Sequence, residues 1–479
     1  MAVKKIQQKE LLYLSIAKSI EQQIGSEVLK VGDKLPSIRF VCRQQGVSMS
    51  TAQLAYHELE KKSLIESRPQ SGYYVSNTFK RRLDMPGTSR PDNKINDNKL
   101  PGVFESTYNR ATDKSIVVFS RGVPSPELLP IAKLNKCVIK AIRELPGSGT
   151  IFEPLQGNEN LRRQVAKWSF SWKGNLAEKD ILTTSGCISA IAWCMMALAK
   201  SGDTIAVESP CFYGILRLAQ SLGLKVLELP TSSQTGVDLD ALKKILERKK
   251  LALCLFVSNF SNPLGSLMPD AHKREAVKLL LHYNVPLIED DLYGDIYFGV
   301  SRPTCCKSYD EAGMVLLCSS VSKTLAPGYR VGWVAPGKFH HEVSRIKLAH
   351  ALSCSPITHE VIASFLENGR YEAHLRKLRH TLHTNYLQYV RVISQHFPEA
   401  TKISRPQGGL SLWVELPRQI DTVDLYNTAI RNKVSISPGH LFTLQKQFNN
   451  CMRLGYGMPW SDKLENGLKL LGKLAKAGV

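Results

Sequence analysis

From about residue 114 onward, short apolar stretches alternate with amphipathic helical patterns, and no other feature of the sequence constrains the fold as strongly. The apolar stretches read DTIAVES, KVLELP, LALCLFVS, VPLIEDD and GMVLLCSS. Strands that alternate with helices are typical of a mostly parallel β-sheet whose faces are covered by those helices. We therefore predict an α/β fold for residues 114–479. The apolar run Cys187–Ala199 is too short to span a bilayer, which predicts a buried helix.

Two further zones precede this α/β part, as expected for a chain of 479 residues, which is longer than one hydrophobic core usually organises. Residues 1–78 are helix-rich and end in an alternating pattern typical of a β-ribbon. Residues 79–113 are polar, contain three prolines and lack an aliphatic pattern, which predicts a flexible linker. Such a linker spans on the order of 30 Å, so it can carry the first zone to a neighbouring subunit.

The charge, the cysteines and the histidines limit which partners and metal ions this chain is expected to bind. Its 63 Lys and Arg residues against 42 Asp and Glu give a formal net charge of +21, which favours nucleic acid as a partner. A generally basic proteome is the alternative explanation of the charge. The eleven cysteines include no C-x-x-C pair, and no signal peptide is visible, so we expect free thiols in a soluble, cytoplasmic protein with no membrane partner. His380 and His383 could share a helix face, but nothing supplies further ligands, so no metal site is predicted.

The first zone reads as three helices followed by a ribbon. A buried helix stripe is predicted by four apolar residues spaced four apart: Leu12, Ile16, Ile20 and Ile24. Ser37 can cap a short helix that Gly46 ends, and Ser48 can cap the next helix. The inner face of that last helix would use Ala52, Ala55 and Leu59. Two short helices across a tight turn make a helix-turn-helix, whose second helix enters the DNA major groove.

The stretches GDKLPSIRFV, GVSMSTAQLAYHELEKKSLI and RPQSGYYV make the first zone specific. Together they resemble the winged helix-turn-helix of GntR-type transcription regulators over nearly all of residues 10–76. The resemblance implies DNA contacts from both helices of the helix-turn-helix and from the wing. The residues are Arg39, Ser48, Ser50, Thr51 and Arg68. Met49 stands where family members often have arginine, so one phosphate contact is absent or moved. The alternative is that the hairpin and ribbon form only a dimerisation module.

Lys323 lies in the stretch SVSKTLAPGYRVGW, among small and apolar residues and close to Arg330. A lysine attacks a carbonyl group only when its amine is neutral, and burial or nearby positive charge lowers its pKa toward that state. The setting fits a lysine that holds pyridoxal 5′-phosphate as a Schiff base. Taken alone the signal is weak, because a lysine in a Ser-rich loop is more often only solvated.

Four other stretches offer the partners that this cofactor needs. Asp290 directly follows an apolar strand and can keep the pyridine nitrogen protonated. Asn262 follows another strand and is suited to donate to the phenolic oxygen. Ser185-Gly186 precedes a predicted helix, whose first backbone N–H groups can bind phosphate. The ring of Phe212 could lie flat on the pyridine ring; an ordinary core aromatic is the alternative.

These stretches, together with FEPLQGNENLRRQ, PQGGLSLWVELP and CMRLGYG, resemble the fold-type-I pyridoxal-phosphate enzymes of the aspartate aminotransferase superfamily across residues 115–479. The resemblance implies large and small subdomains, a Schiff base at Lys323, and a grip on an α-carboxylate by Arg453. It implies that the cofactor is held by Ser185, Gly186, Cys187, Phe212, Asn262, Asp290, Tyr293, Ser320, Lys323 and Arg330. The chain departs from the pattern at Phe152, where relatives usually have tyrosine, and at Ile188, where they have polar residues.

The order of the parts resembles the MocR subfamily of GntR regulators. That resemblance implies a homodimer, with the DNA-binding domain packed on the other subunit, that binds double-stranded operator DNA. It also implies a former enzyme domain that senses an amino compound by exchange at Lys323, or pyridoxal phosphate itself. The main alternative is an active aminotransferase with an appended regulatory domain. A further alternative is an enzyme whose basic N-terminal zone binds only a protein partner.

Overall fold

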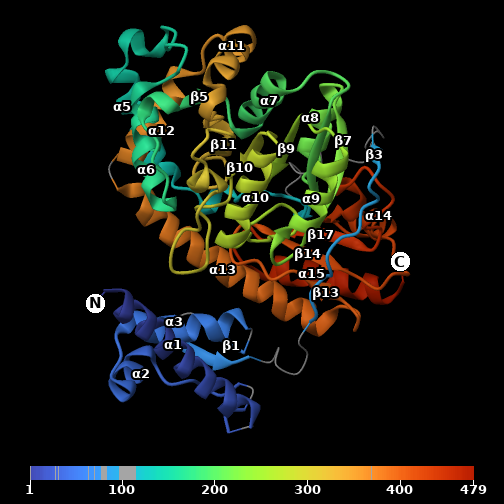
Figure 1. Ribbon diagram of the computed structural model, residues 1–479. Helices are drawn as coiled ribbons and strands as arrows, with labels where there is room; N and C mark the ends of the chain where they lie inside the picture. The colour runs from blue at the N-terminus through green and yellow to red at the C-terminus, as the bar shows by residue number, and fades with distance from the viewer. Residues whose placement is uncertain are drawn as a thin grey trace.

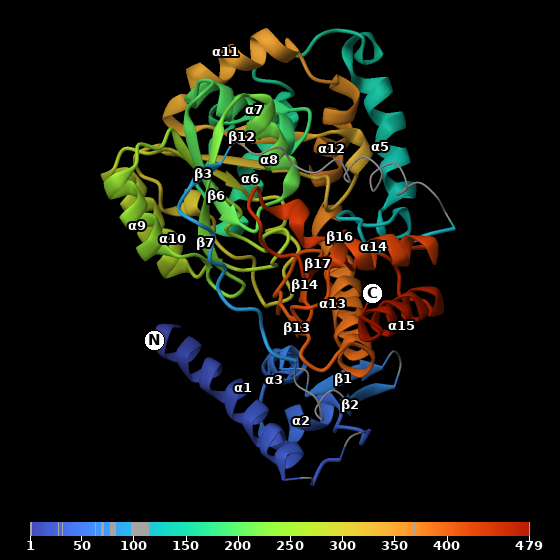
Figure 2. The same ribbon diagram turned by 90° about the vertical axis from the view of Figure 1, so that its right-hand side faces the viewer.

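The computed structural model describes residues 2–26, 28–30, 32–62, 64–68, 71–76, 83–96, 115–367 and 369–478. A small N-terminal domain, within residues 2–76, lies against one end of a much larger domain, within residues 115–478, which is named the effector domain (Figure 1). Figure 2 shows the same arrangement from the side, with the long helix of residues 370–396 between the small domain and the body of the large one.

The N-terminal domain consists of three helices and a two-stranded antiparallel ribbon. Its elements are α1 (Ala2–Gly25), α2 (Ile38–Gln45), α3 (Met49–Lys61), β1 (Ile65–Arg68) and β2 (Gly72–Val75). Ser37 Oγ accepts from the backbone N–H of Phe40, and Gly46 ends α2 with a φ of 59°. Ser48 Oγ accepts from the backbone N–H of Thr51. The predicted helix starts, the predicted helix end and the ribbon are therefore confirmed.

The core of this domain forms where helix periodicity places it, with one exception. The residues that are buried as predicted are Ile16, Ile20, Ile24, Ala52, Ala55 and Leu59. Leu12 is wrong as a core residue, because its side chain is 47% exposed. The hydroxyl of Tyr56 donates to the carbonyl of Pro36 at 2.6 Å and so ties α3 to the segment before α2.

Residues 83–96, which belong to the predicted linker, lie against the effector domain. Leu83 is buried in the effector core, and β3 (Ile95–Asn96) pairs antiparallel with β7 (Lys225–Ser232). Ser89 Oγ donates to the carbonyl of Ser209 at 2.6 Å. The other residues of 79–113 lie outside the described ranges, so the boundaries of the linker stay a prediction.

The effector domain is built on one large sheet in the order β3-β7-β6-β9-β10-β11-β12-β5, with β8 beside β7. Its remaining strands are β5 (Leu182–Thr184), β6 (Thr204–Ser209), β8 (Gly236–Val237), β9 (Leu253–Phe256), β10 (Leu287–Asp290), β11 (Val315–Ser320) and β12 (Gly332–Ala335). The neighbours from β7 through β11 pair parallel, whereas β3, β8, β12 and β5 pair antiparallel. The predicted mostly parallel sheet is confirmed.

Helices cover both faces of this sheet, because successive side chains of a strand point to opposite sides. Ile205 and Val207 of β6 pack in one core with α7 (Cys187–Leu198) and α8 (Tyr213–Ser221). Ala206 packs in a second core on the other face, with α9 (Leu239–Arg248) and α10 (Asp270–His282). The helix α7 confirms the buried helix predicted from the apolar run.

A second layer of helices and a smaller sheet complete the effector domain. The helices are α5 (Ile131–Glu144), α6 (Glu159–Ser169), α11 (His340–Ala351), α12 (Pro356–Glu367), α13 (Arg370–His396), α14 (Thr422–Arg431) and α15 (Asp462–Lys476). The smaller sheet has the order β13-β14-β17-β16, from β13 (Lys402–Ile403), β14 (Ser411–Glu415), β16 (Ser437–Pro438) and β17 (Cys451–Gly455). The short strands β4 (Val117–Val118) and β15 (Val434–Ser435) pair with each other.

Two expectations about the whole chain can be compared with this fold. All eleven cysteines lie within the described ranges, and all are free thiols, as predicted. Among the helices that the structure describes, none combines the length and apolar character needed to cross a membrane.

Candidate functional site

A cavity of about 130 Å³ lies at the carboxyl end of the parallel strands β10 and β11. It brings together side chains that lie far apart in the sequence, from the start of α7 to the segment before β12. Its lining consists of Cys187, Ile188, Ile191, Phe212, Val257, Asn262, Asp290, Leu292, Tyr293, Ser320, Ser322, Lys323 and Arg330. Most of the residues expected to hold a cofactor thus surround one space.

Lys323 follows β11 and is partly buried at this cavity. Its Nζ donates to the carbonyl of Gly122 at 2.7 Å and lies 5.7 Å from the ring centre of Tyr293. Burial, helped by the charge of Arg453 and opposed by that of Asp290, lowers the pKa of Lys323 to about 8. A substantial fraction of the amine is therefore neutral at mildly alkaline pH, which is the form that attacks a carbonyl group.

Asp290 ends β10 at the floor of the cavity and is 6% exposed. Burial raises its pKa to about 6, so the carboxylate is still mostly ionised at neutral pH. The thiol of Cys187 donates to Asp290 Oδ1 at 3.3 Å. Cys187 was expected to help hold a phosphate; here its side chain faces the carboxylate instead, which leaves only its backbone N–H for that role.

Arg453 lies on β17 behind the cavity and is 1% exposed. Its Nη1 donates to Asn262 Oδ1 at 3.1 Å, and its Nη2 donates to Ser437 Oγ at 3.0 Å and to the carbonyl of Ser120. Within the described ranges its Nε has no hydrogen-bond partner, and no acidic side chain pairs with it. A buried cation whose hydrogen-bond partners are all neutral is suited to receive an anion.

Asn262 and Tyr293, which are expected to contact the phenolic oxygen of the cofactor, contact each other in this cavity. Asn262 Nδ2 donates to the hydroxyl of Tyr293 at 3.4 Å. Phe212 precedes α8 and lines the same cavity, and its ring lies 4.5 Å from that of Tyr213 between ring centres. Phe152, the predicted departure, lies on the surface with 76% of its side chain exposed.

The other end of the cavity has the form of an anion cradle. Gly186 caps the N-terminus of α7 with a φ of 96°, which favours glycine. Arg330 Nη2 donates to the carbonyl of Ser185 at 3.2 Å. A Cβ atom at Gly186 would lie 2.5 Å from Arg330 Nη2, so a larger residue would displace the guanidinium. Helix N-terminal N–H groups and a nearby guanidinium are the groups that bind phosphate.

Three residues at this site were not predicted from the sequence. The carbonyl of Gly122 accepts a hydrogen bond from Lys323, and the carbonyl of Ser120 accepts one from Arg453. Ser322 Oγ lines the cavity without a hydrogen-bond partner among the described residues. Gly122 lies 201 positions before Lys323, and no local pattern marks it or Ser120. A lone glycine between Arg121 and Val123 gives no signal that its carbonyl faces a distant amine.

One long helix joins this cavity to the N-terminal domain. Tyr371 and His374 of α13 both contact Thr324, the residue after Lys323: the Tyr371 hydroxyl donates to Thr324 Oγ1 at 3.0 Å, and His374 Nε2 donates to the Thr324 carbonyl at 2.6 Å. Further along α13, the ring of His383 lies 5.0 Å from that of His57 on α3, measured between ring centres.

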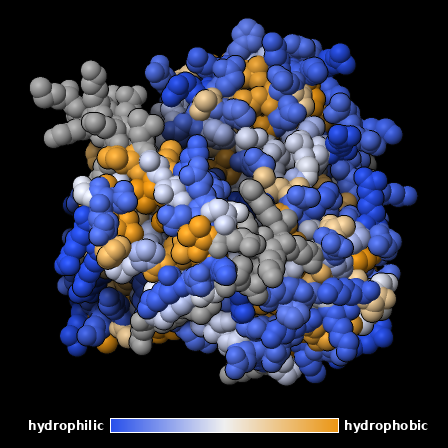
Figure 3. All heavy atoms as spheres, turned by 90° about the horizontal axis from the view of Figure 1, so that it is seen from below, coloured by the Kyte–Doolittle hydropathy of each residue, from blue (hydrophilic) through white to orange (hydrophobic). Residues whose placement is uncertain are grey.

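The candidate DNA-binding residues lie on the N-terminal domain with unequal exposure. Arg39, Ser48 and Ser50 are exposed, and the face seen in Figure 3 combines hydrophilic residues with several apolar patches. Thr51 is 2% exposed and its Oγ1 lies 2.8 Å from Ser48 Oγ, so its side chain packs inward and the expected DNA contact is not supported. Arg68 ends β1, but its side chain lies outside the described part.

Two family models match the chain. The model described as aminotransferase class I and II matches residues 129–469. The model described as bacterial regulatory proteins, gntR family, matches residues 12–75. Together they account for the α/β domain and for the winged helix.

Two curated regulators match nearly the whole length of this chain, and a transaminase matches three quarters of it. The uncharacterized HTH-type transcriptional regulator YjiR of Escherichia coli (strain K12) is 35% identical, covering 96% of this chain and 98% of that protein. The regulator YdcR of the same organism is 34% identical over the same shares. The 2-aminoadipate transaminase of Thermus thermophilus is 26% identical and covers 75% of this chain and 90% of that protein.

Solved structures share the fold of the effector domain. The multiple substrate aminotransferase of Thermococcus profundus superposes with a TM-score of 0.74 at 22% identity, covering 79% of this chain and 96% of that one. The α-aminoadipate aminotransferase LysN of Thermus thermophilus, in complex with N-(5′-phosphopyridoxyl)-L-leucine, gives 0.71 at 24% identity, covering 78% and 97%. The fold is thus that of pyridoxal-phosphate-dependent aminotransferases.

Proposed function

This chain belongs to the MocR-like HTH-type transcriptional regulators, which join a GntR winged helix to a class I and II aminotransferase domain, and we propose that its DNA binding is controlled by an amino acid or related amine bound beside pyridoxal phosphate at Lys323. We further propose that the protein acts as a homodimer, whose two winged helices bind two operator half-sites.

The residues at the cavity fit pyridoxal phosphate. Ser322 Oγ is buried without a partner among the described residues and lines the cavity, which is the state expected of a group that a ligand completes. The cradle of Gly186, Ser320 and Arg330 would hold the phosphate, and Asp290 would hold the pyridine nitrogen. When bound, the cofactor supplies an aldehyde that condenses reversibly with primary amines.

The side chains of this chain supply binding, orientation and proton control. Lys323 offers its neutral amine, and a pKa of about 8 lets it take up or release a proton near neutrality. Asn262 and Tyr293 lie together at one wall, where they would orient the ring through its phenolic oxygen. Arg453 would bind the carboxylate of an incoming amino acid through its guanidinium, in place of its present neutral partners.

The observation that carries this proposal is the buried guanidinium of Arg453 beside the amine of Lys323. Both contact the same short segment: Lys323 bonds to the carbonyl of Gly122, and Arg453 bonds to that of Ser120. An amine that carries a carboxylate can occupy both positions at once. A preference of about 1–3 kcal/mol for one conformation of the domain would change DNA affinity about 5- to 150-fold.

Titration of DNA affinity tests the proposal. A duplex selected from a random library is titrated with the protein alone, with pyridoxal phosphate, and with the cofactor plus single amino acids. We expect at least one amino acid to change the affinity only when the cofactor is present. Arg453→Met should abolish the amino-acid effect while the cofactor still binds. An effect of the cofactor alone, unchanged by every amine, would instead make pyridoxal phosphate the effector.

A working transaminase is the second candidate, and the pKa values of two side chains favour it. Lys323 near 8 and Asp290 near 6 both titrate close to neutrality, as proton-transfer groups do. A single-turnover experiment separates the two functions: conversion of the cofactor to its pyridoxamine form, followed by its return with a keto acid, shows catalysis. A visible spectrum that stays in the aldehyde-derived form with every amine tested excludes it.

A further inference from the structure

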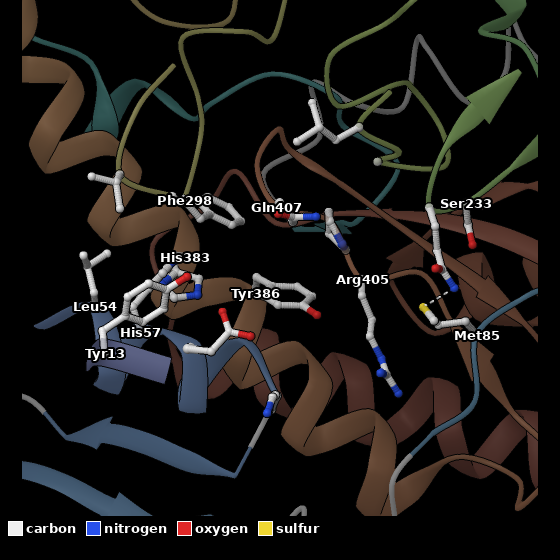
Figure 4. A pocket seen from close by; sticks show the side chains of 18 residues that line it. Tyr13, Leu54, His57, Met85, Ser233, Phe298, His383, Tyr386, Arg405 and Gln407 are labelled. Carbon is white, nitrogen blue, oxygen red and sulfur yellow. Dashed lines mark hydrogen bonds between the residues drawn. The ribbon is translucent and has the colours of Figure 1, made fainter. Parts of the chain in front are cut away.

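Three side chains that can bind a metal converge between the DNA-reading helix and the effector domain. His57 and Glu60 lie three positions apart on α3, and His383 lies on α13. Their possible ligand atoms all lie within 4.8 Å of one another. Figure 4 shows the rings of His57 and His383 side by side, although they come from different domains.

Two imidazoles and one carboxylate are the ligand set of an open zinc site. Such sites use three protein ligands at about 2.0–2.2 Å and leave a fourth position for water or a small ligand. Ligand atoms around a tetrahedral ion are roughly 3.3 Å apart. The present separations therefore need a contraction of about 1.5 Å at most, which is within reach of side-chain rotation.

The surroundings prepare these side chains for a cation. The ring of His383 packs against those of Phe298 and Tyr386, with ring centres 4.9 Å and 6.4 Å away. Glu60 is 6% exposed, and its carboxylate accepts hydrogen bonds from the side chain and backbone of Ser67. Hydrogen bonds of this kind orient metal-binding carboxylates. A cation would compensate the cost of burying this acid.

His57 and His383 line a cavity of about 330 Å³. Its other walls come from both domains and include Tyr13, Tyr386 and Arg405 (Figure 4). The cavity provides a path for an ion and room for a water molecule or a small anion at the open position. It is distinct from the cavity at Lys323, since the two share no lining residue.

We propose that His57, Glu60 and His383 bind one divalent transition-metal ion of the zinc class, which fastens the DNA-reading helix α3 to α13 of the effector domain. The N-terminal end of α3 carries the exposed Ser48 and Ser50, whereas its C-terminal half carries two of the three ligands. The ion thus fixes the direction in which the DNA-facing end of the helix points. Where the sequence alone predicts no metal site, the fold supplies His383 with the missing ligands.

Cobalt titration of metal-free protein tests the site. Co²⁺ occupies zinc sites, and its visible absorption depends on coordination geometry. The protein carries Cys42→Ser, because Cys42 is the one cysteine among the eleven that is not buried. We expect one Co²⁺ per chain, displaced by Zn²⁺. His57→Ala and His383→Ala should each weaken binding by at least about 10-fold. His380→Ala, an exposed position on the same helix, should leave it unchanged.

Thermal unfolding shows whether the ion fastens the two domains. Zn²⁺ should raise the melting temperature of the parent protein and of His380→Ala, but not that of His383→Ala. Because the two histidines belong to different domains, loss of binding in both variants excludes a site within either domain alone. The proposal fails if the parent protein shows no saturable Co²⁺ absorption, or if His380→Ala binds as weakly as His383→Ala. None of these measurements requires pyridoxal phosphate, so they stand or fall independently of the proposed function.

Discussion

The rate at which pyridoxal phosphate loads onto cofactor-free protein should rise with pH, with a midpoint near pH 8, and level off above about pH 9. The buried amine of Lys323 has a pKa of about 8, lowered from 10.5. Its neutral fraction is then roughly 9% at pH 7, 50% at pH 8 and 91% at pH 9, a rise of about 10-fold. A solvated lysine would stay almost fully protonated and would gain about 100-fold over the same interval, without a plateau.

Two variants should move this midpoint in opposite directions. Burial is the largest cause of the lowered pKa, Arg453 lowers it further, and Asp290 raises it. Asp290→Asn should therefore move the midpoint to lower pH, and Arg453→Met should move it to higher pH. Both side chains are also proposed to bind the cofactor or its amine partner, so either substitution can change the size of the loading rate. The pH midpoint of the loading rate is therefore the quantity to compare.

The assay follows visible absorbance after rapid mixing with excess pyridoxal phosphate, from mildly acidic to clearly alkaline pH. Nα-acetyl-lysine under the same conditions gives the solvated reference and removes the titration of the cofactor itself. A profile for the protein that keeps rising in parallel with Nα-acetyl-lysine would refute the lowered pKa. Shifts of the same sign in both variants would refute the assignment of its causes.

Three further perturbations separate the parts of the molecule. Leu59→Ala, at a fully buried position of the winged helix, should destabilise that domain by about 2–5 kcal/mol and reduce DNA binding, with the cofactor spectrum unchanged. Arg39→Gln should weaken binding to all duplexes about equally and reduce the slope of log affinity against log salt by about one phosphate contact. Gly186→Ala should weaken cofactor binding, measured by absorbance titration, because its Cβ would lie 2.5 Å from Arg330 Nη2.

Each of these three has an outcome that would contradict it. A lost cofactor spectrum in the Leu59 variant would mean that the two domains unfold as one unit. A sequence-dependent loss in the Arg39 variant, measured on several duplexes, would indicate base contact instead of phosphate contact. Unchanged cofactor affinity in the Gly186 variant would show that the phosphate does not occupy the cradle beside Arg330.

Features set by neighbouring residues could be predicted from the sequence. The cap of Ser37 and the left-handed Gly46 depend on hydrogen bonds within a few positions, and both form as expected. The strand β10 and its terminal Asp290 follow from a short apolar run and the residue that ends it. The convergence of the cavity residues could be expected because parallel strands share one carboxyl edge.

Features set by tertiary contacts could not be predicted in this way. Leu12 continues the helix stripe, yet the rest of the domain leaves its side chain on the surface. Thr51 is polar and early in α3, but it packs inward, where its hydroxyl meets Ser48. Cys187 turns its thiol to Asp290, 103 positions away. His383 gains its neighbours only because two domains meet.

The 27 residues of α13 connect the Lys323 cavity to the N-terminal domain. Tyr371 and His374, in its first turns, donate hydrogen bonds to Thr324. At 1.5 Å per residue, His383 lies about 14 Å farther along the helix axis than His374. A tilt of about 5° pivoting at Thr324 would swing that histidine by about 1 Å, given this length. Such a swing exceeds the tolerance of a coordination bond, which is about 0.2 Å. A chemical change beside Lys323 could thus reach the winged helix as rigid mechanical motion, without any unfolding between the two.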